Sequence, residues 1–125
     1  MIHLDTSFLI RALVAGSRED RSLRAWLGDG QPIGVSVVSW AEFLCGPVEG
    51  VLVELAARLV GEPEPFTPAD CTATARLFNL GGRRRGSFTD CMIAAVAIRA
   101  GAALATSNRS DFARFAGAGL QFAER

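Results

Sequence analysis

The chain has 125 residues, half of them hydrophobic, and its 13 basic residues balance its 13 acidic ones. This composition indicates one domain, residues 1–125, with a sizeable core and with some apolar surface that a partner would cover. All basic residues are arginine, and the lack of lysine excludes a P-loop, a Schiff-base enzyme and a receiver-type phosphorylation site. No apolar run approaches the ~20 residues of a membrane span and no leader opens the chain, so we expect a cytoplasmic protein.

The pattern of apolar runs and breakers predicts short strands that alternate with helices. In chain order, we expect a strand at 1–4, helices at 6–14 and 18–27, a strand at 32–36, helices at 38–45 and 48–60, a strand at 63–66, helices at 67–80 and 90–100, a strand at 102–106, a helical turn at 108–115 and a strand at 120–123. Such alternation is typical of an α/β fold in which helices cover both faces of a parallel sheet.

Four acidic residues stand out: Asp5, Glu42 and Asp90 lie inside or against strongly apolar runs, and Asp111 follows a strand near the end of the chain. An ionised carboxylate is costly to remove from water unless it is paired, so these acids indicate a common cause. Asp5 and Asp111 follow strands whose carboxyl ends would share one edge of the sheet, and Glu42 and Asp90 lie in early turns of helices that begin there. We therefore expect the four to converge. The structural alternative for Glu42 is an arginine partner.

Convergent carboxylates require a cation, because two like charges about 4 Å apart repel by ~4 kcal/mol at an effective dielectric of about 20. Oxygen ligands without histidine or cysteine favour Mg²⁺, with Mn²⁺ as a substitute, over zinc. Such an ion orients a water, lowers its pKa and neutralises charge that builds on a phosphate, which indicates hydrolysis of phosphodiester bonds. His3, the only histidine, lies in a strand and is interpreted as structural.

Three of the acids also have a capping interpretation. Asp5 could cap the helix that follows it. Asp90 and Asp111 stand three residues after Ser87 and Asn108, so each could complete a capping box. The residues alone leave both interpretations open.

A run of three arginines, Arg83, Arg84 and Arg85, is flanked by glycines and comes shortly before Asp90. Arginine binds phosphate through paired hydrogen bonds and stacks on unpaired bases, so we interpret this loop as an RNA-binding segment. The alternative is a solvated surface loop.

Two further groups of residues concern the core and its surface. No CxxC spacing occurs, so we expect buried, reduced thiols at Cys45, Cys71 and Cys91. The apolar excess makes large aromatic residues candidates for contact with a second copy or another protein, with core packing as the alternative. These aromatic residues are Trp26, Trp40 and Phe43.

The motifs together have a familiar order. They are the strand that ends in Asp5-Thr6-Ser7, the segments 41–46 (AEFLCG) and 90–95 (DCMIAA), and the segment 105–108 (ATSN) with Asp111-Phe112 behind it. In this order and spacing, which spans nearly the whole chain, the sequence resembles the PIN-domain ribonucleases, and most closely the VapC-like toxins of type II toxin-antitoxin modules.

The resemblance implies a PIN-like three-layer sandwich with a parallel sheet of about five strands and helices on both faces. It also implies a magnesium-dependent endoribonuclease that cleaves RNA, forms a homodimer and is inhibited by a cognate protein antitoxin. Such an antitoxin would lay an apolar helix into a groove of the toxin.

The same resemblance assigns roles to individual residues. Asp5, Glu42 and Asp90 match the three core acids, which bind the metal and support catalysis. The family often has aspartate where this chain has Asn108, so either Asn108 is the fourth ligand or Asp111 replaces it. The hydroxyl groups expected to support the metal or the scissile phosphate belong to Thr6 or Ser7, and to Ser107.

Three other functions compete with the nuclease toxin. An aspartyl-phosphate phosphotransferase would need a second acid two residues after Asp5 or a distant lysine, but Ser7 occupies that position and lysine is absent. A PIN-like domain without activity could bind RNA or protein, and Asn108 keeps this alternative open. A PIN nuclease could also act in RNA maturation outside any toxin-antitoxin pair.

Overall fold

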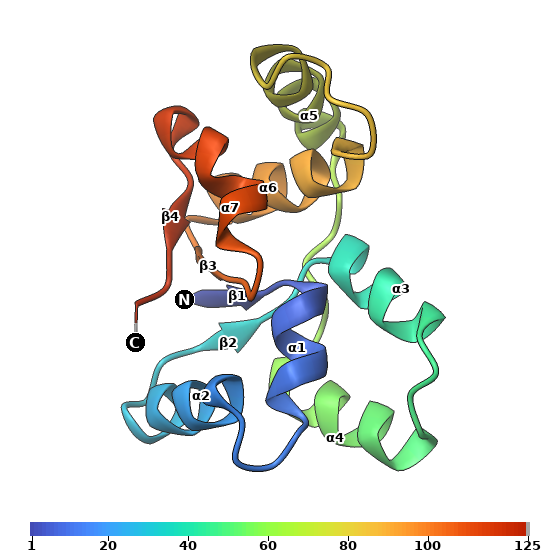
Figure 1. Cartoon of the computed structure of the whole chain (residues 1–125), viewed down its shortest axis with the longest axis vertical. Coiled ribbons are helices and arrows are strands. Elements are labelled where there is room, and N and C mark those ends of the chain that lie inside the picture. The colour runs from blue at the N-terminus through green and yellow to red at the C-terminus, as the bar shows by residue number, and fades with distance from the viewer. Residues whose placement is uncertain (125) are drawn as a thin grey trace.

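The computed structural model describes residues 1–124 and shows an α/β fold in which a parallel sheet separates two groups of helices (Figure 1). The elements in chain order are β1 (Ile2–Leu4), α1 (Thr6–Ala12), α2 (Arg18–Gly28), β2 (Ile33–Gly34), α3 (Val37–Cys45), α4 (Gly50–Val60), α5 (Pro68–Leu80), α6 (Phe88–Ala100), β3 (Ala103–Ala105), α7 (Arg109–Phe112), a 3₁₀ helix (Ala113–Ala118) and β4 (Gln121–Phe122). The predicted alternation of strands and helices is confirmed. Within this described part of the chain, no helix is long and apolar enough to cross a bilayer.

The sheet has the order β2-β1-β3-β4, and all three pairs of strands are parallel. The strand expected at 63–66 is reduced to one bridge between Glu64 and Ser36. Glu64 donates its N–H to the carbonyl of Val35 and accepts from the N–H of Val37. Pro63 and Pro65 on either side have no N–H, so the ladder cannot extend. The sheet therefore has four strands and one bridging residue, against an expected count of about five.

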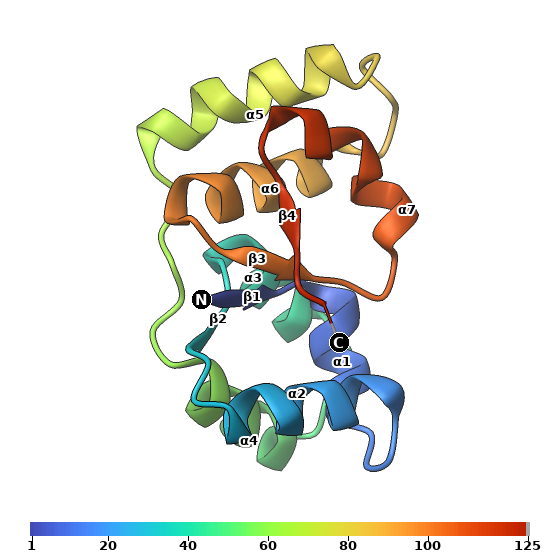
Figure 2. The ribbon, with the colours of Figure 1, turned by 90° about the vertical axis from the view of Figure 1, so that its left-hand side faces the viewer.

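Two apolar cores lie on opposite faces of the sheet, because alternate residues of a strand point to opposite faces. Ile2, Leu4 and Ala105 belong to the core that α1 to α4 cover, whereas Leu104 belongs to the core under α5, α6 and α7. Figure 2 shows α2 and α4 on one side of the sheet and α5 and α6 on the other. The predicted three-layer arrangement is confirmed.

Some expected burial is wrong. Cys45 and Cys71 are exposed, although all three thiols are free as expected and Cys91 is buried. Trp26 and Phe43 pack in the core and are not surface contacts. Both belong to the core under α1 to α4, where Trp26 stacks on Phe8 of α1, and core packing is the commoner fate of large apolar groups.

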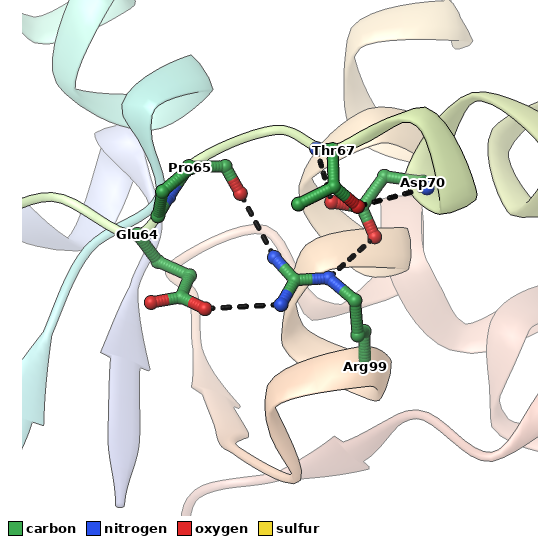
Figure 3. Close-up of polar contacts among 5 residues, drawn as sticks. All are labelled: Glu64, Pro65, Thr67, Asp70 and Arg99. Atoms are coloured by element: carbon green, nitrogen blue, oxygen red, sulfur yellow. Dashed lines mark hydrogen bonds and ion pairs between the residues drawn. The ribbon is translucent and has the colours of Figure 1, made fainter.

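A polar cluster ties the C-terminal end of α6 to the segment that enters α5 (Figure 3). Arg99 donates from Nε to Oδ1 of Asp70 at 2.8 Å, from Nη1 to Oε1 of Glu64 at 3.1 Å, and from Nη2 to the carbonyl of Pro65 at 2.8 Å. Asp70 also forms a capping box with Thr67. Burial acts to raise the pKa of Asp70, but the hydrogen bonds from Arg99 and Thr67 outweigh it and lower the pKa below its ordinary value.

Candidate active site

The five expected metal ligands line one pocket of about 280 Å³ at the carboxyl edge of β1 and β3. These strands are neighbours, and the N–H of Asp5 donates to the carbonyl of Ala105 at 2.9 Å. Residues from α1, α3, α6 and α7 meet at this edge. The pocket is lined by Asp5, Thr6, Ser7, Ile10, Glu42, Asp90, Ile93, Asn108, Asp111 and Phe112.

Asp5 is the most constrained of these acids. It caps α1, since Oδ1 accepts a hydrogen bond of 2.8 Å from the N–H of Phe8 and another of 2.8 Å from Ser7 Oγ. Its Oδ2 accepts from Thr106 Oγ1 at 2.5 Å. Burial raises the pKa of Asp5, the hydrogen bonds from Thr106, Phe8 and Ser7 oppose that rise, and the charge of Glu42 adds to it. The capping interpretation is correct for Asp5, and the same carboxylate also lines the acidic pocket.

Glu42 reaches the pocket from α3. Its Oε1 accepts a hydrogen bond of 2.8 Å from Thr6 Oγ1, and the same hydroxyl contacts the carbonyl of Ser39 at 3.3 Å. Among residues 1–124, Glu42 forms no ion pair with an arginine, so the alternative weighed for it is wrong. Thr6 thus links α1 to α3 and orients this carboxylate.

Asp90 and Asp111 complete the acidic wall from α6 and α7. The capping-box interpretation is wrong for both, because neither Ser87 nor Asn108 makes a side-chain cap bond. Ser87 Oγ instead donates to the carbonyl of Arg84 at 2.7 Å. Burial raises the pKa of Asp90 to about 6; the charges of Asp111 and Glu42 add to the rise, Arg114 opposes it, and Asp5 adds a smaller contribution. The charges of the other three carboxylates therefore all act on Asp90.

The hydroxyl groups expected near the site are divided between two pockets. Thr6 and Ser7 line the acidic pocket. Ser107 instead donates to Oε2 of Glu19 at 2.9 Å and lines a neighbouring pocket of about 360 Å³ with Thr106. Sequence reasoning missed Thr106, whose only signal was its place at the end of the strand next to Asp5.

The three consecutive arginines separate in the structure. Arg84 and Arg85 line a pocket of about 120 Å³ that also contains Asp90 and Asp111. Arg83 turns to α5, where its Nη1 donates to Asn79 Oδ1 at 2.6 Å and its guanidinium lies over the ring of Phe78. Arg114, which the sequence did not single out, also lines the pocket of Arg84 and Arg85.

The donor set of the acidic pocket suits a hard cation. Four carboxylates and the Asn108 side chain surround it, and neither histidine nor cysteine is among its lining residues. Within residues 1–124, however, no three histidine, cysteine, aspartate or glutamate side chains stand close enough together to hold a metal ion. The residues that line the pocket thus suit a divalent ion by their chemistry, but their side chains stand too far apart here for three of them to hold one ion.

The sandwich with an acidic pocket at the ends of its central strands confirms the expected PIN-like fold. The family model of the PIN domain matches residues 2–118. The chain therefore belongs to the PIN domain family. No curated protein matches the sequence.

Solved structures of similar fold cover almost the whole chain. One is VapBC2 from Rickettsia felis bound to a DNA fragment from the promoter, with a TM-score of 0.78, 21% identity and 98% of each chain covered. VapBC-1 from nontypeable Haemophilus influenzae has a TM-score of 0.76 and 22% identity over 99% of this chain and 98% of that one. A toxin-antitoxin complex from Klebsiella pneumoniae has a TM-score of 0.69 and 22% identity over 90% of this chain and 91% of that one. At such identities, the likeness establishes the shared fold.

Proposed function

We propose that this chain is a Mg²⁺-dependent endoribonuclease that hydrolyses phosphodiester bonds of RNA in the cytoplasm, and that it is the toxin of a toxin-antitoxin pair. One observation carries the enzymatic part of the proposal. Asp5, Glu42, Asp90 and Asp111 come from separate parts of the chain and line one pocket, where burial and the charges of the other three acids raise the pKa of Asp90 to about 6. A fold gains nothing from such repulsion unless a cation offsets it.

In this proposal Asp5, Glu42 and Asp90 hold Mg²⁺, or Mn²⁺ in its place, and Asp111 is the fourth carboxylate. Such an ion would lower the pKa of a water and offset the negative charge of the reacting phosphate. Asn108 lines the same pocket and adds a neutral amide oxygen. After burial, the charge of Asp111 is the largest contribution to the raised pKa of Asp90, so in this proposal Asp111 is the fourth carboxylate of the site.

Hydrogen bonds from the described residues hold two of the four acids and leave the other two free of such bonds. Thr106, Ser7 and the N–H of Phe8 hold both oxygens of Asp5, and Thr6 holds Glu42. The carboxylates of Asp90 and Asp111 accept no hydrogen bond from residues 1–124. They are thus available to accept hydrogen bonds from water or to bind a cation, while the first pair is fixed in place.

The toxin part of the proposal rests on the relatives and on apolar surface. The solved structures of similar fold include VapBC proteins and a toxin-antitoxin complex. A pocket of about 320 Å³ between α1, α2 and α4 has a largely apolar wall that includes Leu13, Leu27 and Leu55, of which Leu27 and Leu55 are exposed. An amphipathic helix of a cognate antitoxin would suit such a groove. We further propose a homodimer, because other apolar side chains, including Ile10 and Leu44, are exposed.

The deciding experiment is cleavage of single-stranded RNA by the purified chain. Cleavage is expected with Mg²⁺ or Mn²⁺, and EDTA or the Asp5→Asn and Asp90→Asn substitutions should abolish it while the fold is retained. Glu54→Gln on the exposed side of α4 is the matched control and should cleave as the wild type does. Cleavage that persists in EDTA or in both aspartate variants would contradict the proposal.

A second candidate function is a PIN domain that binds RNA without cutting it, and Asn108 in place of the family's usual aspartate favours it. RNA binding without cleavage under any divalent ion would select this candidate. A maturation nuclease would instead cleave RNA but have no antitoxin gene beside its own.

A further inference from the structure

A second pocket, of about 120 Å³, adjoins the acidic pocket and shares Asp90 and Asp111 with it. The rest of its wall is formed by Gly86, Ser87 and three arginines, which are Arg84, Arg85 and Arg114. A pocket with three arginines in its wall therefore adjoins the pocket that is lined by four carboxylates. A pocket of this size has room for a phosphate group.

The outer two arginines have no partner of their own. Arg84 and Arg85 are exposed, and within residues 1–124 their guanidinium groups form neither a hydrogen bond nor an ion pair. Arg83, by contrast, is engaged by Asn79 and Phe78. Two of the three consecutive arginines are thus available to a ligand at this pocket.

The inner arginine is fixed but incompletely bonded. Arg114 Nη1 donates to the carbonyl of Asp111 at 2.6 Å, and the guanidinium lies 4.4 Å from the centroid of the Phe115 ring. Its Nε and Nη2 are buried and have no hydrogen-bond partner among residues 1–124. The Cys91 thiol beside it is only a weak acceptor. A Cβ at Gly81 would lie 3.0 Å from Nε, so this glycine leaves room for the guanidinium.

We propose that Arg84, Arg85 and Arg114 form a phosphate-binding pocket for the RNA strand, which holds a phosphate next to the one cleaved at the acidic pocket. This inference rests on the proposed function. A phosphodiester has two unesterified oxygens that accept hydrogen bonds from guanidinium groups, and Arg84 and Arg85 present exposed guanidinium groups at this pocket while Arg114 lies in its wall. Three guanidinium groups also offset the repulsion between the four carboxylates and the RNA backbone. Arg114 is the rigid inner contact, and Arg84 and Arg85 close over the phosphate from outside.

The first test measures binding of a short fluorescent single-stranded RNA, which spans a cleavage site, to the full chain in EDTA at several salt concentrations. Arg114→Gln is expected to weaken binding about tenfold and to reduce the log–log salt slope by about 0.7, the value for one phosphate contact on a single strand. Arg84→Gln combined with Arg85→Gln should act in the same direction. Arg76→Gln, an exposed change of equal charge on α5 outside the pocket, should leave affinity and slope close to those of the wild type.

The second test locates the phosphate with RNAs in which single linkages are replaced by uncharged methylphosphonate. At one linkage beside the cleavage site, the uncharged replacement should weaken binding of the RNA to the wild type. It should not weaken binding to the Arg114→Gln variant further, because the phosphate charge and the arginine form the same contact. If Arg114→Gln fails to fold in a thermal scan, the Arg84/Arg85 double variant takes its place, because neither side chain has a contact to lose.

The results distinguish a failure of the phosphate-binding pocket from a failure of the proposed nuclease activity. If the wild type cleaves RNA but every linkage affects wild type and variant equally, the phosphate pocket is wrong and the nuclease stands. If the wild type neither binds nor cleaves RNA, both are wrong. If the arginine variants weaken binding of an acidic antitoxin peptide and leave RNA binding unchanged, the pocket belongs to a protein partner and this inference is overturned.

Discussion

Thr106 and Asp5, which are 101 residues apart in the sequence, are joined by a hydrogen bond of 2.5 Å from Thr106 Oγ1 to Asp5 Oδ2. The bond crosses from the end of β3 to the end of β1, the two central strands of the sheet. With Oδ1 occupied by Phe8 and Ser7, it leaves the buried Asp5 carboxylate a single orientation. Thr106 also accepts a hydrogen bond from the N–H of Asn108 at 3.0 Å. One threonine therefore positions two residues of the acidic pocket.

We expect Thr106→Val to weaken divalent-ion binding and RNA cleavage by about 10- to 100-fold, the usual effect of removing a group that orients a metal ligand. The valine keeps the shape of the side chain but cannot donate to Asp5, whose pKa should rise further. Thr106→Ser restores the hydroxyl and is the matched control. Mn²⁺ titration by calorimetry measures the loss of affinity separately from cleavage. Equal affinities for the valine and serine variants would show that Thr106 has no such role.

The metal-free protein should lose stability as the pH rises from about 4 to about 6. Asp90 has an ordinary pKa of 3.8 and a folded-state pKa of about 6, so in this range the folded protein binds more protons than the unfolded chain. Asp90→Asn removes this penalty. With allowance for the partial exposure of Asp90, the variant should be more stable by about 1 kcal/mol at pH 7.5 and equally stable at pH 4.

Urea denaturation in EDTA at the two pH values measures this difference, and Glu54→Gln is the control for a lost surface charge. A variant that is less stable than the wild type at pH 7.5 would mean that Asp90 serves the fold. Such a result would remove the electrostatic argument for a cation site.

Most of the acidic pocket could be predicted from the sequence because three of its four acids break a local pattern. Asp5 ends an apolar strand, Glu42 and Asp90 lie in apolar helices, and strand order brings them to one edge. Thr106 and Arg114 break no pattern: a threonine suits a strand end, and an arginine suits a surface turn. The role of Thr106 becomes visible only when β3 pairs with β1. Arg114 is recognised only from two buried guanidinium nitrogens that have no hydrogen-bond partner among residues 1–124.

The limits of pattern reading are also visible in α4. Val51 and Leu55 recur at helical spacing, and the helix is where that spacing predicts it. The buried side chains, however, are Ala56 and Val60, while Val51 and Leu55 are 67% and 47% exposed. Periodicity identifies a helix and an apolar stripe, but it does not say whether the stripe faces the protein's own core or surface that a partner could cover.

Arg99→Gln should destabilise the fold by about 2 kcal/mol, a figure reduced from that of a fully buried ion pair because Arg99 is 32% exposed. The change leaves Asp70, which is 1% exposed, without its cationic partner. Because Arg99 lowers the folded-state pKa of Asp70, the wild type has this stabilisation above the ordinary pKa of the carboxyl and loses it as the pH falls through the lowered value. The difference between variant and wild type should therefore shrink in acid.

Urea denaturation at neutral and acidic pH tests this expectation. Arg24→Gln is the control, since the exposed Arg24 side chain pairs with Asp20 one helical turn away and its loss should change stability little. If both substitutions cost the same, the cluster around Arg99 does not hold α5 and α6 in place.

The identity of the fourth ligand can be decided with two opposite substitutions, Asp111→Asn and Asn108→Asp. Both residues line the acidic pocket, but only Asp111 adds charge to it. Asp111→Asn should weaken Mn²⁺ binding about tenfold or more and lower the pKa of Asp90, because one repelling carboxylate is gone. Asn108→Asp should tighten Mn²⁺ binding and make the metal-free protein less stable at neutral pH, since a fifth carboxylate joins the pocket. Calorimetric titration and urea denaturation in EDTA measure the two effects.

A third variant, Asn108→Ala, tests the alternative ligand. If Asn108→Ala weakens Mn²⁺ binding more than Asp111→Asn does, the amide of Asn108 is the ligand, and Asp111 acts only through the charge that it adds beside Asp90.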